Sequence, residues 1–272
     1  MTQVLLCDNG SRQPAATLML REIAQKLSQI AQRDIVPASL QHSNKIDKSL
    51  LNGEPAISLP QLLSQSLQQG EKDFIILPLF FGKSRAITAF IPEQKQLLEQ
   101  QYGAFSIRLA EVLYPLPEGD AELVKIIYQN IQHSRNRIQQ PIEKIVLVDH
   151  GSPVPKVTEV RQSIARQLQT LLGKQIQLSQ AVMERREGSE YDFNGDLLQH
   201  WLTQQAEQGV KRVIVAMMFL LPGRHAGPDG DVNDICRQVM QLHPGFEVII
   251  SPLVGDNPLL ISLLHSRLKA LG

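Results

Sequence analysis

Two histidines and one glutamate in the second half of this sequence each follow a run of residues typical of a buried strand. His150 follows the apolar residues 145–148, Glu184 ends the next such run, and His225 follows the third. Neutral imidazole is a good ligand for first-row divalent ions, and a carboxylate adds an anionic ligand or a proton acceptor. Three such groups at adjacent strand ends could share one ion and leave coordination positions open, as catalytic or delivery sites do.

The first half of the sequence repeats this pattern with different polar residues. At a constant offset of 141 residues, Asp8, Gly10 and Ser11 match the residues around His150, and helical positions match as well. The places of His150, Glu184 and His225 are taken by Asn9, Gln41 and Ser84. Singly, such a histidine is usually a capping residue and such a glutamate a solvated charge. The joint replacement by groups that do not titrate near neutral pH favours one working site and one degenerate site.

Strand-like and helical segments alternate in the order β-α-β-α-β-α-β-α in each half. Right-handed crossovers then predict an α/β fold of two tandem doubly wound parallel-sheet domains related by internal duplication. We expect an N-terminal domain over residues 1–137 with the degenerate site and a C-terminal domain over 138–272 with the active site. In the second half we expect strands at 145–148, 176–182, 213–220 and 246–250, and helices at 156–172, 196–208 and 232–242.

Composition excludes several classes of function. The 27 basic and 27 acidic residues balance, which argues against nucleic acid or an anionic membrane as the partner. No stretch is long and apolar enough for a membrane span or a signal segment. The two cysteines, Cys7 and Cys236, are far apart in the sequence, so we expect free buried thiols in a reducing, cytoplasmic compartment.

Other motifs narrow the chemistry further. Neither GxGxxG nor GxxxxGK[ST] occurs, so nucleotide binding is disfavoured, and Ser152 lacks the GxSxG turn of a hydrolase. Three arginines flank the site residues and would suit carboxylates or phosphates, although each could be a solvated charge: Arg185, Arg186 and Arg224. Asp229 and Asp231 could form a second metal patch, but their surroundings are foremost a turn signal.

These motifs resemble the class II tetrapyrrole chelatases, and within them a fused two-domain form of the sirohydrochlorin cobaltochelatase/ferrochelatase group. The residues that carry the resemblance are Asp149-His-Gly-Ser152 after a buried strand, Glu184 at the next strand end, and Phe219-Leu-Leu-Pro-Gly-Arg-His225 after the third. The resemblance covers nearly the whole chain.

The resemblance implies a lyase-type, ATP-independent enzyme that inserts a divalent metal into sirohydrochlorin for siroheme or cobalamin. It implies that His150, Glu184 and His225 bind the metal and accept the pyrrole protons. Ser152 and the three arginines would bind the substrate's carboxylates. Cobalt, iron and nickel all suit such a site. A monomer is expected, with a dimer as the alternative. A non-catalytic metal or tetrapyrrole carrier, or a two-lobed binding protein without metal, are the other interpretations.

Overall fold

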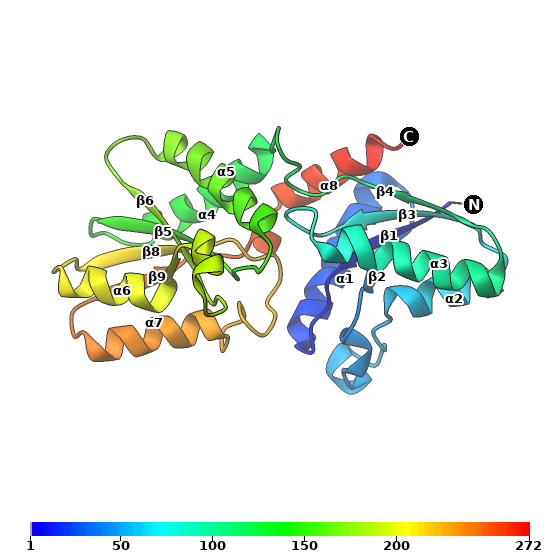
Figure 1. Cartoon of the computed structure of the whole chain (residues 1–272), viewed down its shortest axis with the longest axis horizontal. Coiled ribbons are helices and arrows are strands. Elements are labelled where there is room, and N and C mark those ends of the chain that lie inside the picture. The colour runs from blue at the N-terminus through cyan, green and yellow to red at the C-terminus, as the bar shows by residue number, and fades with distance from the viewer. Residues whose placement is uncertain (1) are drawn as a thin grey trace. The chain divides into compact units, whose positions relative to one another are not determined.

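The computed structural model describes residues 2–272 and contains two wholly parallel β-sheets (Figure 1). The first sheet has the strand order β2-β1-β3-β4, and the second has the order β7-β6-β5-β8-β9. The strands are β1 (Gln3–Asp8), β2 (Ile35–Ser39), β3 (Asp73–Pro78), β4 (Ser106–Leu109), β5 (Lys144–Asp149), β6 (Leu178–Val182), β7 (Asp196–Leu197), β8 (Arg212–Met217) and β9 (Glu247–Ile250). Apart from the additional edge strand β7, both sheets share one topology, as the duplication predicted.

Helices connect successive strands and cover both faces of each sheet. The α-helices are α1 (Pro14–Ala31), α2 (Leu59–Gln68), α3 (Ile91–Tyr102), α4 (Ala121–Asn136), α5 (Pro155–Leu172), α6 (Leu198–Glu207), α7 (Asp231–Leu242) and α8 (Leu259–Lys269). Short helical turns are η1 (Ser43–Lys45), η2 (Lys48–Leu51), η3 (Ala86–Phe90), η4 (Ser189–Asn194) and η5 (Val254–Asp256). None of the described helices has the length and apolar character needed to cross a membrane.

The chain folds into two compact units, and each contains the last helix of the other repeat. The first unit comprises the residues up to Pro115 together with Leu260–Gly272, and the second comprises Leu116–Leu259. Helix α4 packs in the second unit, where Asn130 donates to the carbonyl oxygens of Pro252 and Leu253. Helix α8 packs in the first unit, where Arg267 donates to two carbonyl oxygens at residues 112 and 113.

The second unit has a helix layer on each face of its sheet. The pair α6 and α7 packs together over one face, and α4 and α5 pack together over the other. Residues 145–148 of the central strand are all fully buried, because a parallel sheet with helices on both faces has no solvated side. A contiguous apolar core on the α6 and α7 side contains Trp201 and the free thiol of Cys236.

Most predicted element ends are shifted by no more than two residues, as for β6, which begins at Leu178 instead of residue 176. Larger differences occur at two places in this unit. Asp196 and Leu197, expected to begin a helix, instead pair with β6 as a short edge strand, and α6 begins only at Leu198. Strand β8 ends at Met217, three residues before the predicted end. There the carbonyl oxygens of Phe219 and Leu220 accept hydrogen bonds from the turn at residues 254 and 255, which draws the chain out of the sheet.

Candidate active site

The three predicted site residues lie at one edge of the second sheet. His150 follows β5, Glu184 lies two residues beyond β6, and His225 lies in the loop between β8 and α7. Strand β5 is hydrogen-bonded to β6 on one side and to β8 on the other. Because the strands are parallel, their carboxyl ends meet at the same edge, and the sheet brings all three loops together.

The side chain of His150 contacts the side chains of both His225 and Glu184. The His150 and His225 rings lie edge to face, with their centroids 4.6 Å apart and their planes at 72°. His150 Nε2 lies 3.2 Å from Glu184 Oε1. The side chains are 45% exposed for His150, 61% for Glu184 and 31% for His225, so a ligand can reach the cluster from solvent.

Both histidines are oriented through their Nδ1 atoms. His150 Nδ1 lies 3.0 Å from the carbonyl oxygen of Gly151, and His225 Nδ1 lies 2.5 Å from Asp231 Oδ2. When Nδ1 of His225 carries the proton for its contact, the Nε2 lone pair of that neutral ring is free, whereas Nε2 of His150 faces the Glu184 carboxylate. Asp231 is in the first turn of α7, where the helix dipole favours a carboxylate. Asp231, whose sequence surroundings mainly indicated a turn, therefore orients His225.

No three His, Cys, Asp or Glu side chains among residues 2–272 are arranged to hold a metal ion. His150 and Glu184 contact each other directly. A divalent ion entering here would have to separate Glu184 from His150 Nε2 to reach the lone pair of that nitrogen.

A glycine allows the His150 loop to approach the Glu184 backbone closely. Gly151 has φ +91°, and a Cβ at this position would lie 2.0 Å from the carbonyl oxygen of Glu184. In the same contact the Glu184 N–H donates to the carbonyl oxygen of His150 at 3.1 Å. The first unit has the same arrangement, with Gly10 against the carbonyl oxygen of Gln41. The structure thus supports the predicted equivalence of Gln41 and Glu184.

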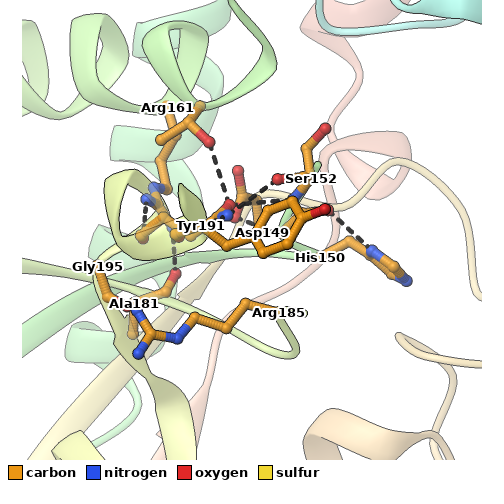
Figure 2. A network of polar contacts seen from close by, with 11 residues as sticks. Asp149, His150, Ser152, Arg161, Ala181, Arg185, Tyr191 and Gly195 are labelled. Atoms are coloured by element: carbon orange, nitrogen blue, oxygen red, sulfur yellow. Dashed lines mark hydrogen bonds and ion pairs between the residues drawn. The ribbon is translucent and has the colours of Figure 1, made fainter. Parts of the chain in front are cut away.

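A buried ion pair adjoins the His150 loop (Figure 2). Arg161 of α5 donates to Asp149 Oδ1 at 3.0 Å, and both residues are buried. Burial raises the pKa of Asp149, and the Arg161 guanidinium offsets only part of that rise. Arg161 escaped the sequence prediction. A comparison of the two halves could have identified it. The offset of 141 residues aligns Arg161 with Leu20, which is a buried core residue of α1.

The four residues predicted to bind substrate are placed differently from one another. Arg185 is occupied, since it donates to the carbonyl oxygen of Gly195 at 3.2 Å and pairs with Asp192 at 3.1 Å. Arg186 lies 5.8 Å from the Tyr191 ring in a cation–π contact. Arg224 is 78% exposed and lies 3.8 Å from Asp231. The Ser152 hydroxyl accepts the N–H of Val154 and thus shapes the loop before α5.

A cavity in this unit lies away from the histidine cluster. It has a volume of about 940 Å³ and is lined by α4, the end of β9 and the turn after it. None of His150, Glu184 and His225 lines it. The cluster is an exposed edge of the sheet and not the wall of this cavity.

Comparisons with known proteins identify the family and the fold of the chain. A search of curated protein sequences found no match. Among solved structures, SirB from Bacillus subtilis with Fe3+ superposes with a TM-score of 0.70 and 16% identity, covering 98% of this chain and 94% of that chain. A structure described as the sirohydrochlorin chelatase SirB from Bacillus subtilis subspecies spizizenii in complex with cobalt gives 0.64 and 16%, with the same coverage.

A third structure, CbiX, described as the terminal enzyme for biosynthesis of siroheme in denitrifying bacteria, has a TM-score of 0.62 and 16% identity and covers 98% of each chain. At this identity the three likenesses show the chelatase fold. The CbiX family model matches residues 3–134 and 144–271, so it accounts for both repeats. The chain therefore belongs to the CbiX family, as the resemblance of its motifs to the sirohydrochlorin chelatases predicted.

Proposed function

We propose that this CbiX-family enzyme inserts a divalent metal ion into sirohydrochlorin in siroheme or cobalamin biosynthesis. The observation that carries the proposal is the convergence of His150, Glu184 and His225 at one exposed sheet edge, with two imidazoles oriented through Nδ1. The family supplies the reaction class, and these three side chains supply the ligands and the base that the reaction needs.

The reaction exchanges two pyrrole protons for one divalent ion. We propose that the Nε2 atoms of His150 and His225 hold the incoming ion. The Glu184 carboxylate accepts the two pyrrole protons one after the other and releases the first to solvent before it takes the second. The free-base nitrogens cannot bind the ion until their N–H protons leave, so a base next to the metal ligands is required. Glu184 suits this role because its carboxylate is 61% exposed and contacts His150. Asp231 holds the imidazole of His225 in the tautomer that ligates.

The substrate's carboxylates need cationic partners near the cluster. We propose Arg186 and Arg224 for this task, since both are exposed and Arg224 adjoins His225 in the chain. Arg185 would reach a substrate only after leaving Asp192 and the Gly195 carbonyl oxygen. We propose that the Ser152 hydroxyl donates a hydrogen bond to a substrate oxygen, because its own oxygen already accepts from the backbone N–H of Val154.

The metal is proposed to be cobalt or iron, with nickel as a further substrate. Imidazole and carboxylate bind all three ions, and the order of affinity follows the ion more than the ligands. The SirB structures are described with Fe3+ and with cobalt, which supports the choice of these two metals. We place the reaction in the cytoplasm, in a monomer and without nucleotide. The free buried thiols of Cys7 and Cys236 fit a reducing compartment.

An anaerobic absorbance time course of the protein with sirohydrochlorin tests the proposal. Cobalt, ferrous iron and nickel are supplied separately, and the rate is compared with the reaction without protein. Multiple turnovers above that rate, with release of the metallated ring, establish the enzyme and rank its metals. One equivalent of bound, spectrally shifted macrocycle without turnover would instead identify a tetrapyrrole carrier. Absence of any spectral change with all three metals would overturn the proposal.

A further inference from the structure

We infer that Arg161 is a positioning residue that holds the His150 loop and the Glu184 strand in the geometry needed for metal capture. The inference rests on the proposed function for its consequence, but its physical basis is the hydrogen bonding of one buried side chain. Arg161 is only 2% exposed, so its guanidinium acts on the site from within the unit (Figure 2).

The Arg161 guanidinium joins three segments of the chain that carry or flank the site. Its Nη1 donates to Asp149 Oδ1 at 3.0 Å and to the carbonyl oxygen of Ala181 at 2.7 Å. Its Nη2 donates to the carbonyl oxygen of Asn194 at 2.6 Å. Asp149 precedes His150 directly, and Ala181 lies three residues before Glu184. One side chain thus ties β5, β6 and η4 together.

Two of these partners, Asp149 and Asn194, also form hydrogen bonds with the backbone that follows His150. Asp149 Oδ1 accepts the N–H of Gly151 at 3.1 Å in addition to Arg161. The Asn194 side chain accepts the N–H of Ser152 at 3.0 Å and donates to the carbonyl oxygen of Ser152 at 2.9 Å. The peptide groups that follow the histidine are therefore fixed by groups that Arg161 holds in place. Because the Gly151 carbonyl oxygen is the contact of His150 Nδ1, this restraint extends to the imidazole.

The first unit shows that the fold itself does not need this arginine. Leu20 is the equivalent of Arg161 and is buried in α1. The equivalent of Asp149 is Asp8, and its Oδ1 is buried with no hydrogen-bond partner in the described structure. A buried ion pair is on average no more stabilising than apolar residues of similar volume, so stability alone is a weak reason for Arg161. The arginine is found in the unit that carries the histidines, and the leucine in the unit that has lost them.

Taken together, these positions indicate that Arg161 holds the site residues in place and does not bind the substrate directly. Arg161 contacts neither His150 nor Glu184, and its exposure is too low for it to meet a macrocycle. Its loss should loosen the metal-capturing loop while leaving the affinity for sirohydrochlorin unchanged. This predicts a fall in kcat and in metal affinity with little change in KM for the macrocycle.

The test uses the double variant Asp149→Asn/Arg161→Leu in the full-length protein. Replacing both residues avoids an unpaired buried charge, and asparagine retains the oxygen that accepts from Gly151. Arg161→Lys is the conservative variant and should restore part of the function, because it keeps the charge but cannot bond all three segments. Arg21→Leu is the matched control. Arg21 donates to three backbone carbonyl oxygens of the first unit, so its loss removes comparable bonds away from the site.

Two readouts separate positioning from stability. The first is hydrogen–deuterium exchange of the peptide over residues 149–152. Exchange should accelerate by about tenfold or more in the double variant at a temperature where it is fully folded, since bonds to charged groups are lost. The second is titration with Co2+ alone, where the affinity should fall by roughly 10- to 100-fold. Arg21→Leu should lower Tm and change neither readout.

The outcomes distinguish this inference from the proposed function. Unchanged loop exchange in the double variant overturns the positioning role whatever the chemistry of the site. Unchanged Co2+ affinity and kcat, in a protein whose loop has loosened, overturn it as well. Failure of the wild-type protein to bind cobalt or to metallate sirohydrochlorin would overturn the proposed function. In that case the hydrogen–deuterium exchange of residues 149–152 would still decide whether Arg161 orders this loop.

Discussion

The Nε2 atom of His150 lies 3.2 Å from Oε1 of Glu184, and the backbone N–H of Glu184 donates to the carbonyl oxygen of His150. The two residues are thus joined through both side chain and main chain, although 34 positions of sequence separate them. A contact between a neutral imidazole lone pair and a carboxylate needs a shared proton, because both atoms are otherwise acceptors. An entering divalent ion can take the place of that proton. This single exchange would couple metal binding to proton transfer.

Changing Glu184→Gln keeps the shape of the side chain and removes the base. We expect the rate of sirohydrochlorin metallation to fall by roughly 10²- to 10⁴-fold, the usual contribution of a positioned general base. Binding of the free macrocycle, followed by its absorbance or fluorescence, should be retained. Glu187→Gln is the matched control, since Glu187 is exposed on the same loop. A Glu184→Gln protein that metallates at the wild-type rate would remove Glu184 from the mechanism.

Changing Asp231→Asn weakens the support of His225 without touching its ligand atom. The 2.5 Å contact to Nδ1 would lose its negative charge, so the ring would be less firmly oriented and less basic. Loss of such a carboxylate partner lowers metal affinity by about 10- to 100-fold, and a Co2+ titration should show this decrease. Asp229→Asn, in the exposed part of the same loop, should leave the affinity unchanged. Equal affinities in the two variants would contradict an orienting role for Asp231.

Changing Gly151→Ala tests the close approach of the two backbones at the site. The added Cβ would lie 2.0 Å from the Glu184 carbonyl oxygen, so the His150 loop must move. We expect a lower free energy of unfolding in urea and a loss of Co2+ binding. Gly10→Ala creates the same clash with Gln41 in the first unit and should lower stability while sparing metal binding. Metal binding that survives Gly151→Ala would show that the loop position is not critical.

The sequence predicted the sheet topology and the placement of the histidines well. Residues 145–148 form an uninterrupted apolar run, which is the pattern of a central strand of a parallel sheet, and such strands deliver polar loops to one edge. His150, Glu184 and His225 follow three such strands, so their proximity came from topology alone. The comparison with Asn9, Gln41 and Ser84 separated them from the other polar residues.

The remaining features depend on tertiary contacts that local pattern does not encode. Asp196 has the polarity of a helix start, yet it pairs with Ala181 at the sheet edge. Arg185 looked available for a substrate, but Asp192 and the Gly195 carbonyl oxygen bind it. Arg161 was not among the predicted site residues. Only the match with Leu20 marks it as a core position, where an arginine has to find buried partners.

Changing Asp8→Asn should stabilise the protein at neutral pH. Burial raises the pKa of the Asp8 carboxyl, so the folded protein holds this proton more tightly than the unfolded chain. Stability therefore falls as pH rises from the ordinary aspartate pKa through the raised one, and the full cost is present above it. We expect a higher free energy of unfolding at neutral pH, because asparagine removes the charge whose burial is costly while it keeps an oxygen that can accept from Ser39 and Gly10.

The advantage of Asp8→Asn should disappear below the ordinary pKa of aspartate, where the carboxyl is protonated in both states. Urea unfolding as a function of pH measures this. An Asp8→Asn protein less stable than wild type at neutral pH would show that the hydrogen bonds of the carboxylate to Ser39 and Gly10 outweigh the cost of burying its charge.

The most direct test of a single working site compares two matched double variants in the sirohydrochlorin metallation assay. His150→Ala/His225→Ala removes both imidazoles of the second unit, and Asn9→Ala/Ser84→Ala removes the equivalent groups of the first. Initial rates with Co2+ should fall to the uncatalysed rate in the first variant and stay near the wild-type rate in the second. Equal rates in the two variants, or loss of activity only in the Asn9→Ala/Ser84→Ala protein, would contradict the assignment of the active site to the second unit.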